Sequence, residues 1–263
     1  MSVTIKSPRE IELMREAGRI LAITHEELGK ALRPGMSTLD IDRLGEEIIR
    51  SHGCIPSFKN YNGYPASICV SVNDEVVHGI PDRHHIIQEG DIVSLDAGVI
   101  YKGYHSDSAR THAVGEISPE AAKLIEVTRK SFFEGIKYAK PGNHLNDISQ
   151  AIQAYAEAFG YGVVRDLVGH GIGEHLHEDP EVPNFAQKRK GIRLQAGMTL
   201  AVEPMINMGR PDVCWLDDDW TVVTEDGSLS AHYENTILIC ENGPEILSMQ
   251  DSEKEEMRRL GLL

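Results

Sequence analysis

Residues 92–107 read IVSLDAGVIYKGYHSD, and this stretch decides what kind of fold the chain can form. Strand-forming residues flank Lys102-Gly103, which predicts two antiparallel strands joined by a two-residue turn. With a two-residue turn, the residue numbers of each pair of facing residues add to the same odd number. The numbers of Asp96 and Asp107 also add to an odd number. Both carboxylates therefore lie on one face of the hairpin, side by side or one pair apart.

The two carboxylates of this hairpin need an explanation. Carboxylates held this close repel each other unless a cation lies between them or one of them is protonated. Asp is common at turns and strand ends, so Asp96 or Asp107 alone would more often be structural. Together, inside an otherwise apolar hairpin, they favour a cation site.

Two helices are expected before the hairpin. The first begins at residues 7–10 (SPRE), which supply the serine, proline and glutamate of a capping box, and it ends near Pro34. The second begins after Ser37-Thr38 and ends at Gly53. Short strands are expected at residues 67–72, 75–78, 91–101 and 106–114.

The second half of the chain repeats this order at a constant offset of 107 residues. A helix opens at Ser118, another follows at residues 145–159, and strands come after that. The matched positions are Pro34-Gly35 with Pro141-Gly142, Asp40-Ile41 with Asp147-Ile148, Gly53 with Gly160, Gly90 with Gly197, and Asp96 with Glu203. An offset that stays constant over about 60 positions indicates an internal duplication.

The duplication predicts an α+β fold with two pseudo-symmetric halves, roughly residues 1–116 and 117–263. In this fold, helices cover an antiparallel sheet and the functional site lies where the halves meet. No Pro-, Ser- or Gly-rich linker separates the halves, so residues 1–263 are expected to form a single domain.

The composition is that of an ordinary globular protein. Of 263 residues, 41% are hydrophobic and 25% are charged, which excludes a disordered chain, a collagen and a coiled coil. The net charge of −15 makes the chain a poor general polyanion binder. The chain has neither the roughly 18 consecutive apolar residues of a membrane helix nor a secretory signal, so we expect a cytoplasmic protein. Cys54, Cys214 and Cys240 are expected to be reduced and buried.

A Gly-rich segment offers a nitrogen ligand. Residues 169–178 read GHGIGEHLHE and place His170 and His177 close together. A lone histidine is more often structural than a ligand, but two in one such segment favour function. Alternation would put His175 and His177 on one strand face, and spacing alone does not separate their roles.

Two more carboxylates stand at the ends of apolar strands. Glu203 follows the run 198–202, where an unpaired buried carboxylate costs several kcal/mol. A metal would compensate that cost, and a salt bridge to an arginine is the alternative. Glu234 precedes a second apolar run, which by itself is a weak signal because such residues are common on surfaces.

The candidates combine four carboxylates with one imidazole: Asp96, Asp107, His170, Glu203 and Glu234. This donor set suits divalent Mn, Fe, Co or Zn and excludes a soft thiolate site. Four negative charges call for two divalent ions, and two ions about 3.5–4 Å apart form a hydrolytic centre. Such a centre lowers the pKa of a bound water until hydroxide exists near neutral pH.

These residues resemble those of the type I methionine aminopeptidases, a group of pita-bread metallopeptidases, in their short bacterial form. The matching segments are PASIC (65–69), NDEVVHGIP (73–81), residues 96–107, GHGIG (169–173), Glu203-Pro204 and the strand at Glu234. The resemblance implies hydrolysis of the N-terminal methionine from peptides and nascent chains, preferably before a small second residue. It implies a water bridging two metals as the nucleophile. A monomer with a transient ribosome contact is expected.

The resemblance also implies a role for each residue. Asp96 would bind one metal through both oxygens, Asp107 and Glu234 would bridge the pair, and His170 with Glu203 would complete the other metal. For catalysis, His177 would contact the scissile carbonyl or the tetrahedral intermediate, His78 would contact the substrate backbone, and Glu203 would shuttle a proton. The methionine pocket would be lined by Tyr61, Tyr64, Cys69, His78 and Trp220, and His177 would also bind the substrate. A monovalent cation (Na or K) would lie at Asn73, Glu75 and Ser230.

Three positions depart from the family pattern, and two other functions remain open. Phe58 and Leu176 change the shape of the pocket more than its polarity, and Glu174 replaces a basic residue of several relatives. An Xaa-Pro peptidase of the same fold usually carries an additional N-terminal domain, whereas only about 90 residues precede the first ligand strand here. A non-catalytic peptide-binding or ribosome-binding module would lose ligands, whereas all five are present.

Overall fold

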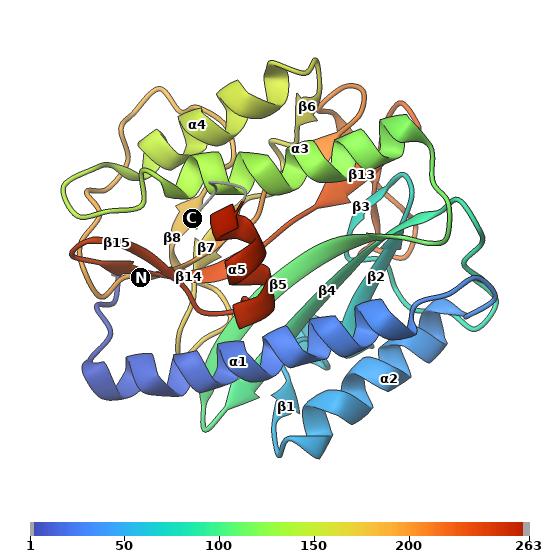
Figure 1. The fold of residues 1–263 in the computed structure, drawn as a ribbon, viewed down its shortest axis with the longest axis horizontal. Helices are drawn as coiled ribbons and strands as arrows, with labels where there is room; N and C mark the ends of the chain where they lie inside the picture. Colours follow the sequence, from blue (N-terminus) through green and yellow to red (C-terminus); the bar gives the residue numbers. More distant parts are fainter. Residues whose placement is uncertain (1–2, 260–263) are drawn as a thin grey trace.

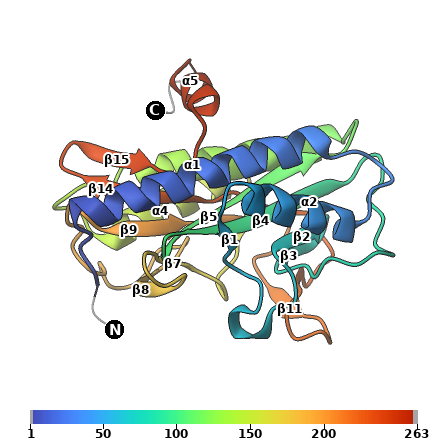
Figure 2. The same cartoon turned by 90° about the horizontal axis from the view of Figure 1, so that it is seen from below.

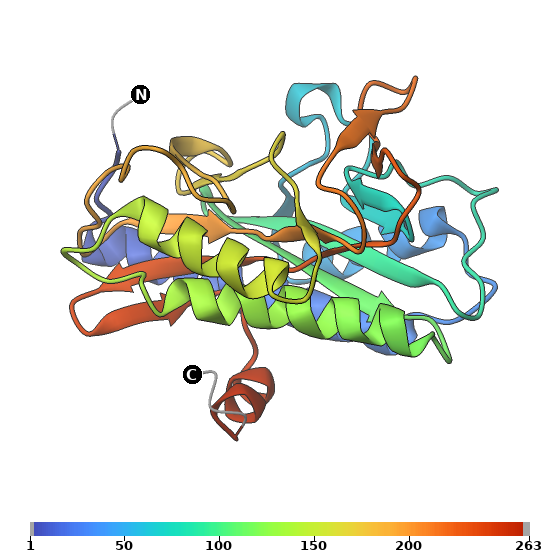
Figure 3. The same cartoon turned by 90° about the horizontal axis from the view of Figure 1, so that it is seen from above.

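The computed structural model describes residues 3–259. Its helices lie on one face of a curved antiparallel sheet, and the longer loops lie on the opposite face (Figures 2 and 3). The helices are α1 (Pro8–Ala31), α2 (Thr38–Ser51), α3 (Pro119–Ile136), α4 (Leu145–Glu157) and α5 (Asp251–Arg259). The first four agree with the predicted segments to within a few residues.

The hairpin of β4 (Ile92–Tyr101) and β5 (Tyr104–Ala113) has the predicted two-residue turn. Lys102 and Gly103 both have positive φ, 48° and 88°, as a tight hairpin turn requires. Because Gly98 pairs with Asp107, Asp96 and Asp107 lie one pair apart on the same face. The parity argument is confirmed, although β5 begins two residues earlier than predicted.

The sheet combines strands from both halves of the chain. In the first half, β4 also pairs with β1 (Ile55–Pro56) and β2 (Ile68–Val72). The halves meet where the Ala109 amide donates to the Glu234 carbonyl at 3.3 Å and the Glu234 amide donates to the Ala109 carbonyl at 3.0 Å. The second half has the strand order β15 (Gly243–Ile246), β14 (Asn235–Cys240), β9 (Thr199–Val202), β7 (Gly169–Gly171) and β8 (Glu178–Val182).

Several smaller elements complete the fold. The 3-10 turn η1 covers Tyr61–Gly63. Two three-stranded sheets have the orders β13-β10-β6 and β11-β12-β3. Their strands are β3 (Glu75–Val77), β6 (Gly162–Val163), β10 (Met205–Asn207), β11 (Val213–Trp215), β12 (Val222–Thr224) and β13 (Ser230–His232).

The internal repeat is visible in the backbone hydrogen bonds. The Gly35 amide donates to the Ile87 carbonyl at 2.8 Å, and 107 residues later Gly142 donates to Leu194 at 3.1 Å. Asp40 closes a capping box at the start of α2, and Asp147 does so at the start of α4. The constant offset thus reflects two copies of the same turn and helix N-terminus. This repeat confirms the pseudo-symmetric halves.

Each half has its own apolar core. In the first, α1 and α2 pack on β2 and β4 through residues such as Leu21, Ile41, Val70 and Leu95. In the second, α3 and α4 pack on β9 and β14 through residues such as Phe132, Ile148, Leu200 and Ile237. Because each core holds its strands rigidly, side chains at the seam between the halves are fixed from both sides.

Three local features differ from the sequence predictions. Helix α5 was not predicted, because its sequence DSEKEEMRR has only one apolar residue and so no periodicity. Residues 173–177 form a bend, so His175 and His177 do not share a strand face. Cys214 is exposed while Cys54 is buried and Cys240 is half-buried, because Cys214 lies on the edge strand β11 and faces away from the apolar cluster that Val213 contacts.

Within residues 3–259, no helix is both long enough and apolar enough to span a membrane.

Candidate metal centre

The five predicted ligands lie at the seam between the two halves. Asp96 and Asp107 project from the hairpin β4–β5, and His170 is the middle residue of β7. Glu203 directly follows β9, and Glu234 stands between β13 and β14. All five line the same cavity, so the fold brings together residues that are up to 138 positions apart (234 − 96).

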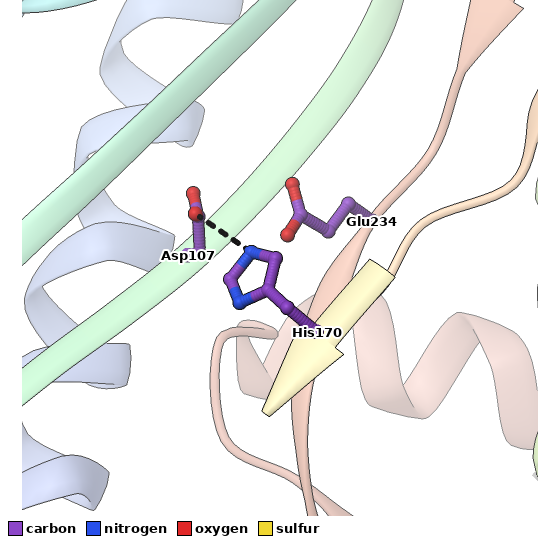
Figure 4. Close-up of side chains that lie close together, drawn as sticks. All are labelled: Asp107, His170 and Glu234. Atoms are coloured by element: carbon purple, nitrogen blue, oxygen red, sulfur yellow. Dashed lines mark ion pairs between the residues drawn. The ribbon is translucent and has the colours of Figure 1, made fainter. Parts of the chain in front are cut away.

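Asp107, His170 and Glu234 form a compact group within the cluster (Figure 4). One donor atom from each of these side chains lies within 4.8 Å of the others. The Nε2 atom of His170 is 3.8 Å from Asp107 Oδ2 and 3.6 Å from Glu203 Oε1. These separations leave room for an ion between the donor atoms rather than direct hydrogen bonds.

The backbone around His170 orients its ring for metal binding. The Nδ1 atom lies 2.8 Å from the carbonyl oxygen of Gly171, so Nδ1–H donates there and the Nε2 lone pair faces the carboxylates. The flanking glycines allow this packing, since a Cβ on Gly169 would stand 2.4 Å from the Ala201 carbonyl oxygen. Burial lowers the pKa of His170 to about 3, which keeps the imidazole neutral.

The carboxylates are buried without enough partners. Asp96 Oδ1, Asp107 Oδ1 and Glu234 Oε1 have no hydrogen-bond partner among the described residues. Burial raises the pKa of Asp96 to about 7. Burial, and next the charges of neighbouring carboxylates, raise the pKa values of Asp107, Glu203 and Glu234 well above their usual range. Bound divalent ions would reverse this effect, so the residues present fit the predicted cations.

A cavity of about 220 Å³ opens beside the ligands. It is smaller than the roughly 300–1,000 Å³ of typical ligand pockets, which suits a single side chain. All the predicted substrate-binding residues line it, namely Tyr61, Tyr64, Cys69, His78, His177 and Trp220. Phe58 and Leu176 line it as well. Glu174 is exposed and is not among the lining residues.

Two aromatic side chains build one wall of this cavity. The Tyr64 hydroxyl donates to the carbonyl oxygen of Gly79 at 2.9 Å, which fixes the ring in place. The ring of Trp220 packs edge-on against Tyr64, with centroids 5.1 Å apart. Cys69 is buried beside them and pairs with Asp96 across β2 and β4. This soft, aromatic wall ends directly at the carboxylate cluster.

The two predicted catalytic histidines occupy different places at the cavity. The Tyr61 hydroxyl lies 2.6 Å from Nδ1 of His177, whose ring centroid is 4.2 Å from that of His170. His78 has a left-handed backbone, with φ of 60°, and its ring lies edge-on to Trp220 at 6.3 Å. Burial lowers the pKa of His78 to about 4, so this side chain is a neutral hydrogen-bonding group.

The predicted monovalent cation residues lie outside this cluster. Asn73 and Ser230 are neighbours, since the Ser230 amide donates to the Asn73 carbonyl at 2.9 Å. Glu75 accepts a hydrogen bond from the Val72 amide at 2.7 Å. The monovalent cation stays a prediction.

Several functional candidates escaped the sequence analysis. The Thr236 hydroxyl accepts from the Asp107 amide at 2.8 Å, and the Asn184 side chain donates to the Glu203 carbonyl at 3.0 Å. His232 is buried, and its Nε2 atom lies 3.9 Å from Glu234 Oε2. Its position two residues before Glu234, which would put both on one strand face, could have indicated it as a candidate. Asn62, Val77, Leu167, Val168 and Met205 also line the cavity, and nothing in the sequence distinguishes them from core or loop residues.

Comparison with known proteins agrees with this site. The model of metallopeptidase family M24 matches residues 12–241. The methionine aminopeptidase of Clostridium acetobutylicum is 58% identical over 94% of this chain and 99% of its own length. Methionine aminopeptidase 1 of Bacillus subtilis is 53% identical over 94% of this chain and 99% of its own length.

Solved structures give the same result at the level of the fold. The methionine aminopeptidase of Thermotoga maritima has a TM-score of 0.93 and 46% identity, covering 95% of this chain and 100% of that one. An Xaa-Pro dipeptidase of Bacillus anthracis has a TM-score of 0.77 and 27% identity, and the match covers 94% of this chain but only 62% of that protein. The chain belongs to metallopeptidase family M24, and its relatives place it among the methionine aminopeptidases of that family.

Proposed function

We propose that this protein hydrolyses the N-terminal methionine from peptides and nascent chains, preferably before a small second residue, with two divalent metal ions. The observation that carries the proposal is the position of the small aromatic cavity beside the five clustered ligands. An unbranched thioether suits a wall of Tyr64, Trp220 and Cys69, because sulfur–aromatic contacts are favourable. The full-length similarity to proteins named methionine aminopeptidase supports the same substrate.

The two ions, when bound, would activate a water molecule and polarise the scissile carbonyl group. Asp96, Asp107, Glu234, His170 and Glu203 would hold them. Asp107 and Glu234 would bridge the pair, and the closeness of their donor atoms to that of His170 supports this role. Glu203 lines the cavity beside the other ligands, where it would accept a proton from the water and return it to the leaving amine.

The two cavity histidines would orient the substrate. The bond between Tyr61 and Nδ1 of His177 leaves Nε2 as the atom available to the substrate carbonyl. His78, neutral at physiological pH, would hydrogen-bond the substrate backbone beside Trp220. The cytoplasmic location, the monomeric state and the ribosome contact stay predictions.

The test compares peptides that begin Met-Ala with Xaa-Pro peptides, each assayed with a chelator and after adding Mn, Fe, Co or Zn. We expect methionine release from Met-Ala peptides, loss of activity with the chelator, and recovery with at least one metal. Release that is insensitive to the chelator would contradict the metal-dependent reaction. Preferred cleavage before proline would favour the Xaa-Pro peptidase, and no cleavage with any metal would favour the binding module.

A further inference from the structure

A buried arginine lies behind the metal centre and takes no part in the site described above. Arg110 belongs to β5, three residues after Asp107, and its guanidinium is buried. Its Nη1 atom donates to the carbonyl oxygens of Glu234 at 2.6 Å and of Ala109 at 2.9 Å. Its Nη2 atom donates to the Asn235 side chain at 2.8 Å. One side chain therefore contacts the backbone of β5, which carries Asp107, and the backbone of Glu234, the other predicted bridging residue.

The contacted carbonyls lie at the seam between the two halves. Ala109 and Glu234 exchange the two backbone hydrogen bonds that join β5 to the start of β14. The rigid planar guanidinium adds fixed donors at this point. It thereby sets how closely the backbone of Glu234 approaches that of the strand carrying Asp107.

The C-terminal helix supplies the charge that balances this arginine. Glu253 of α5 lies 3.2 Å from Nη2 of Arg110 and also accepts a hydrogen bond from the Tyr233 hydroxyl at 2.9 Å. The guanidinium stacks over the Tyr233 ring, 4.4 Å from its centroid. In Figure 1, α5 lies between α1 and α3 and crosses β5, on the helix face of the sheet.

We propose that Arg110 and Glu253 are positioning residues, through which helix α5 sets the affinity of the metal centre. The proposal rests on the proposed function, because it concerns the ligands Asp107 and Glu234. Neither residue touches the ions or the substrate. Arg110 holds the backbone of Glu234 against β5, and Glu253 holds Arg110 in that orientation.

The physical argument is one of geometry. A bridging carboxylate binds two ions well only when its distance from the other ligands is fixed, and partners behind the ligands normally supply that restraint. Removing the Glu253 charge leaves the guanidinium of Arg110 buried without its counter-ion, which favours a rearrangement of that side chain. The Glu234 carbonyl then loses a charge-assisted hydrogen bond, and the ligand spacing is no longer held.

The test measures divalent metal binding by calorimetry, with Mn or Co titrated into metal-free protein. For Glu253→Gln we expect the dissociation constant to rise by about 10-fold to 100-fold, with kcat lowered and KM for a Met-Ala peptide little changed. The matched control is Glu255→Gln, the same substitution on an exposed residue of the same helix that pairs with Arg259. It should bind metal like the unaltered protein.

A second variant covers the case in which Glu253→Gln fails to fold. The double substitution Arg110→Met with Glu253→Gln removes both charges, and such apolar replacement of a buried ion pair is often neutral for stability. It still removes the donor to the Glu234 carbonyl, so we expect weakened metal binding in a folded protein.

Unchanged metal affinity in the folded double variant, or in Glu253→Gln, would overturn the proposal. A lower melting temperature with unchanged affinity would also overturn it, since that result means a purely structural role. Failure of the proposed function itself is distinguishable, because the unaltered protein would then release no methionine from a Met-Ala peptide, whatever its affinity for metal.

Discussion

At the scale of single residues, the carboxylates at the seam determine what the molecule can do. Asp107 is fixed by Thr236, and one of its oxygens has no hydrogen-bond partner among the described residues. Such a buried acceptor is costly unless a cation satisfies it. Two predictions belong to this scale, one for a ligand and one for a buried histidine away from the centre.

Asp107→Asn should abolish methionine release while the fold is kept. The amide preserves the shape of the side chain but removes the negative charge that two cations would share. The measurement is kcat/KM with a Met-Ala peptide, together with circular dichroism. Asp212→Asn, at an exposed site, is the control and should be fully active. A rate above about a tenth of the control, or about 1.4 kcal/mol in barrier height, would mean that Asp107 is not a bridging ligand.

His112 should make the protein less stable as pH falls. Burial, and next the charge of Arg110, lower the pKa of His112 to about 4, against an ordinary value of 6.5. Between these values the unfolded chain binds the extra proton, so the free energy of unfolding decreases as pH falls from about 6.5 to about 4.

The measurement for His112 is urea unfolding of metal-free protein at pH 7 and pH 5. In His112→Gln the decrease between the two pH values should be smaller than in the unaltered protein. His84→Gln, at an exposed site, is the control and should leave the decrease unchanged. An equal decrease in His112→Gln would show that folding does not lower the pKa of His112.

At the scale of elements, the β4–β5 hairpin carries both aspartates, and its register decides their common face. The register depends on the turn at Lys102 and Gly103. Lys102 adopts φ of 48°, a conformation that lysine rarely adopts and asparagine adopts readily. The turn is therefore a place where the sequence is not optimal for its structure.

Lys102→Asn should stabilise the protein by about 0.5 kcal/mol, since Asn-Gly is the preferred pair for this turn. Gly103→Ala should destabilise it by about 1 kcal/mol, because φ of 88° disfavours any side chain. A Cβ on Gly103 meets no atom within 4 Å, so the effect would come from the backbone alone. Urea denaturation measures both, and equal stabilities would contradict this account of the turn.

At the scale of the whole molecule, the site joins two separately packed halves. Asp96 and Asp107 belong to the first half, while His170, Glu203 and Glu234 belong to the second. A ligand that binds across this seam binds the folded state only. Metal binding should therefore be coupled to global stability.

Divalent metal should raise the free energy of unfolding by about 2.7 kcal/mol when its free concentration is 100 times the dissociation constant. The measurement is the unfolding midpoint with and without chelator. Asp107→Asn is the matched control and should respond much less to metal. An equal midpoint with and without chelator in the unaltered protein would contradict a metal site across the seam.

The sequence by itself determined the first four helices, the common face of Asp96 and Asp107 and the duplication, and it predicted the five ligands. Capping residues, the parity of a two-residue turn and a constant offset need no knowledge of distant contacts. Helix α5 has a polar sequence without periodicity, and it is stabilised by Glu253 and by the buried Met257.

Only the tertiary structure decided the rest of the site. Arg110 looks like an ordinary strand residue until the fold places it against the Glu234 carbonyl. Val77 and Met205 look like core residues until the cavity opens beside them. Such roles arise from contacts between residues far apart in the chain, and a local pattern contains no information about them.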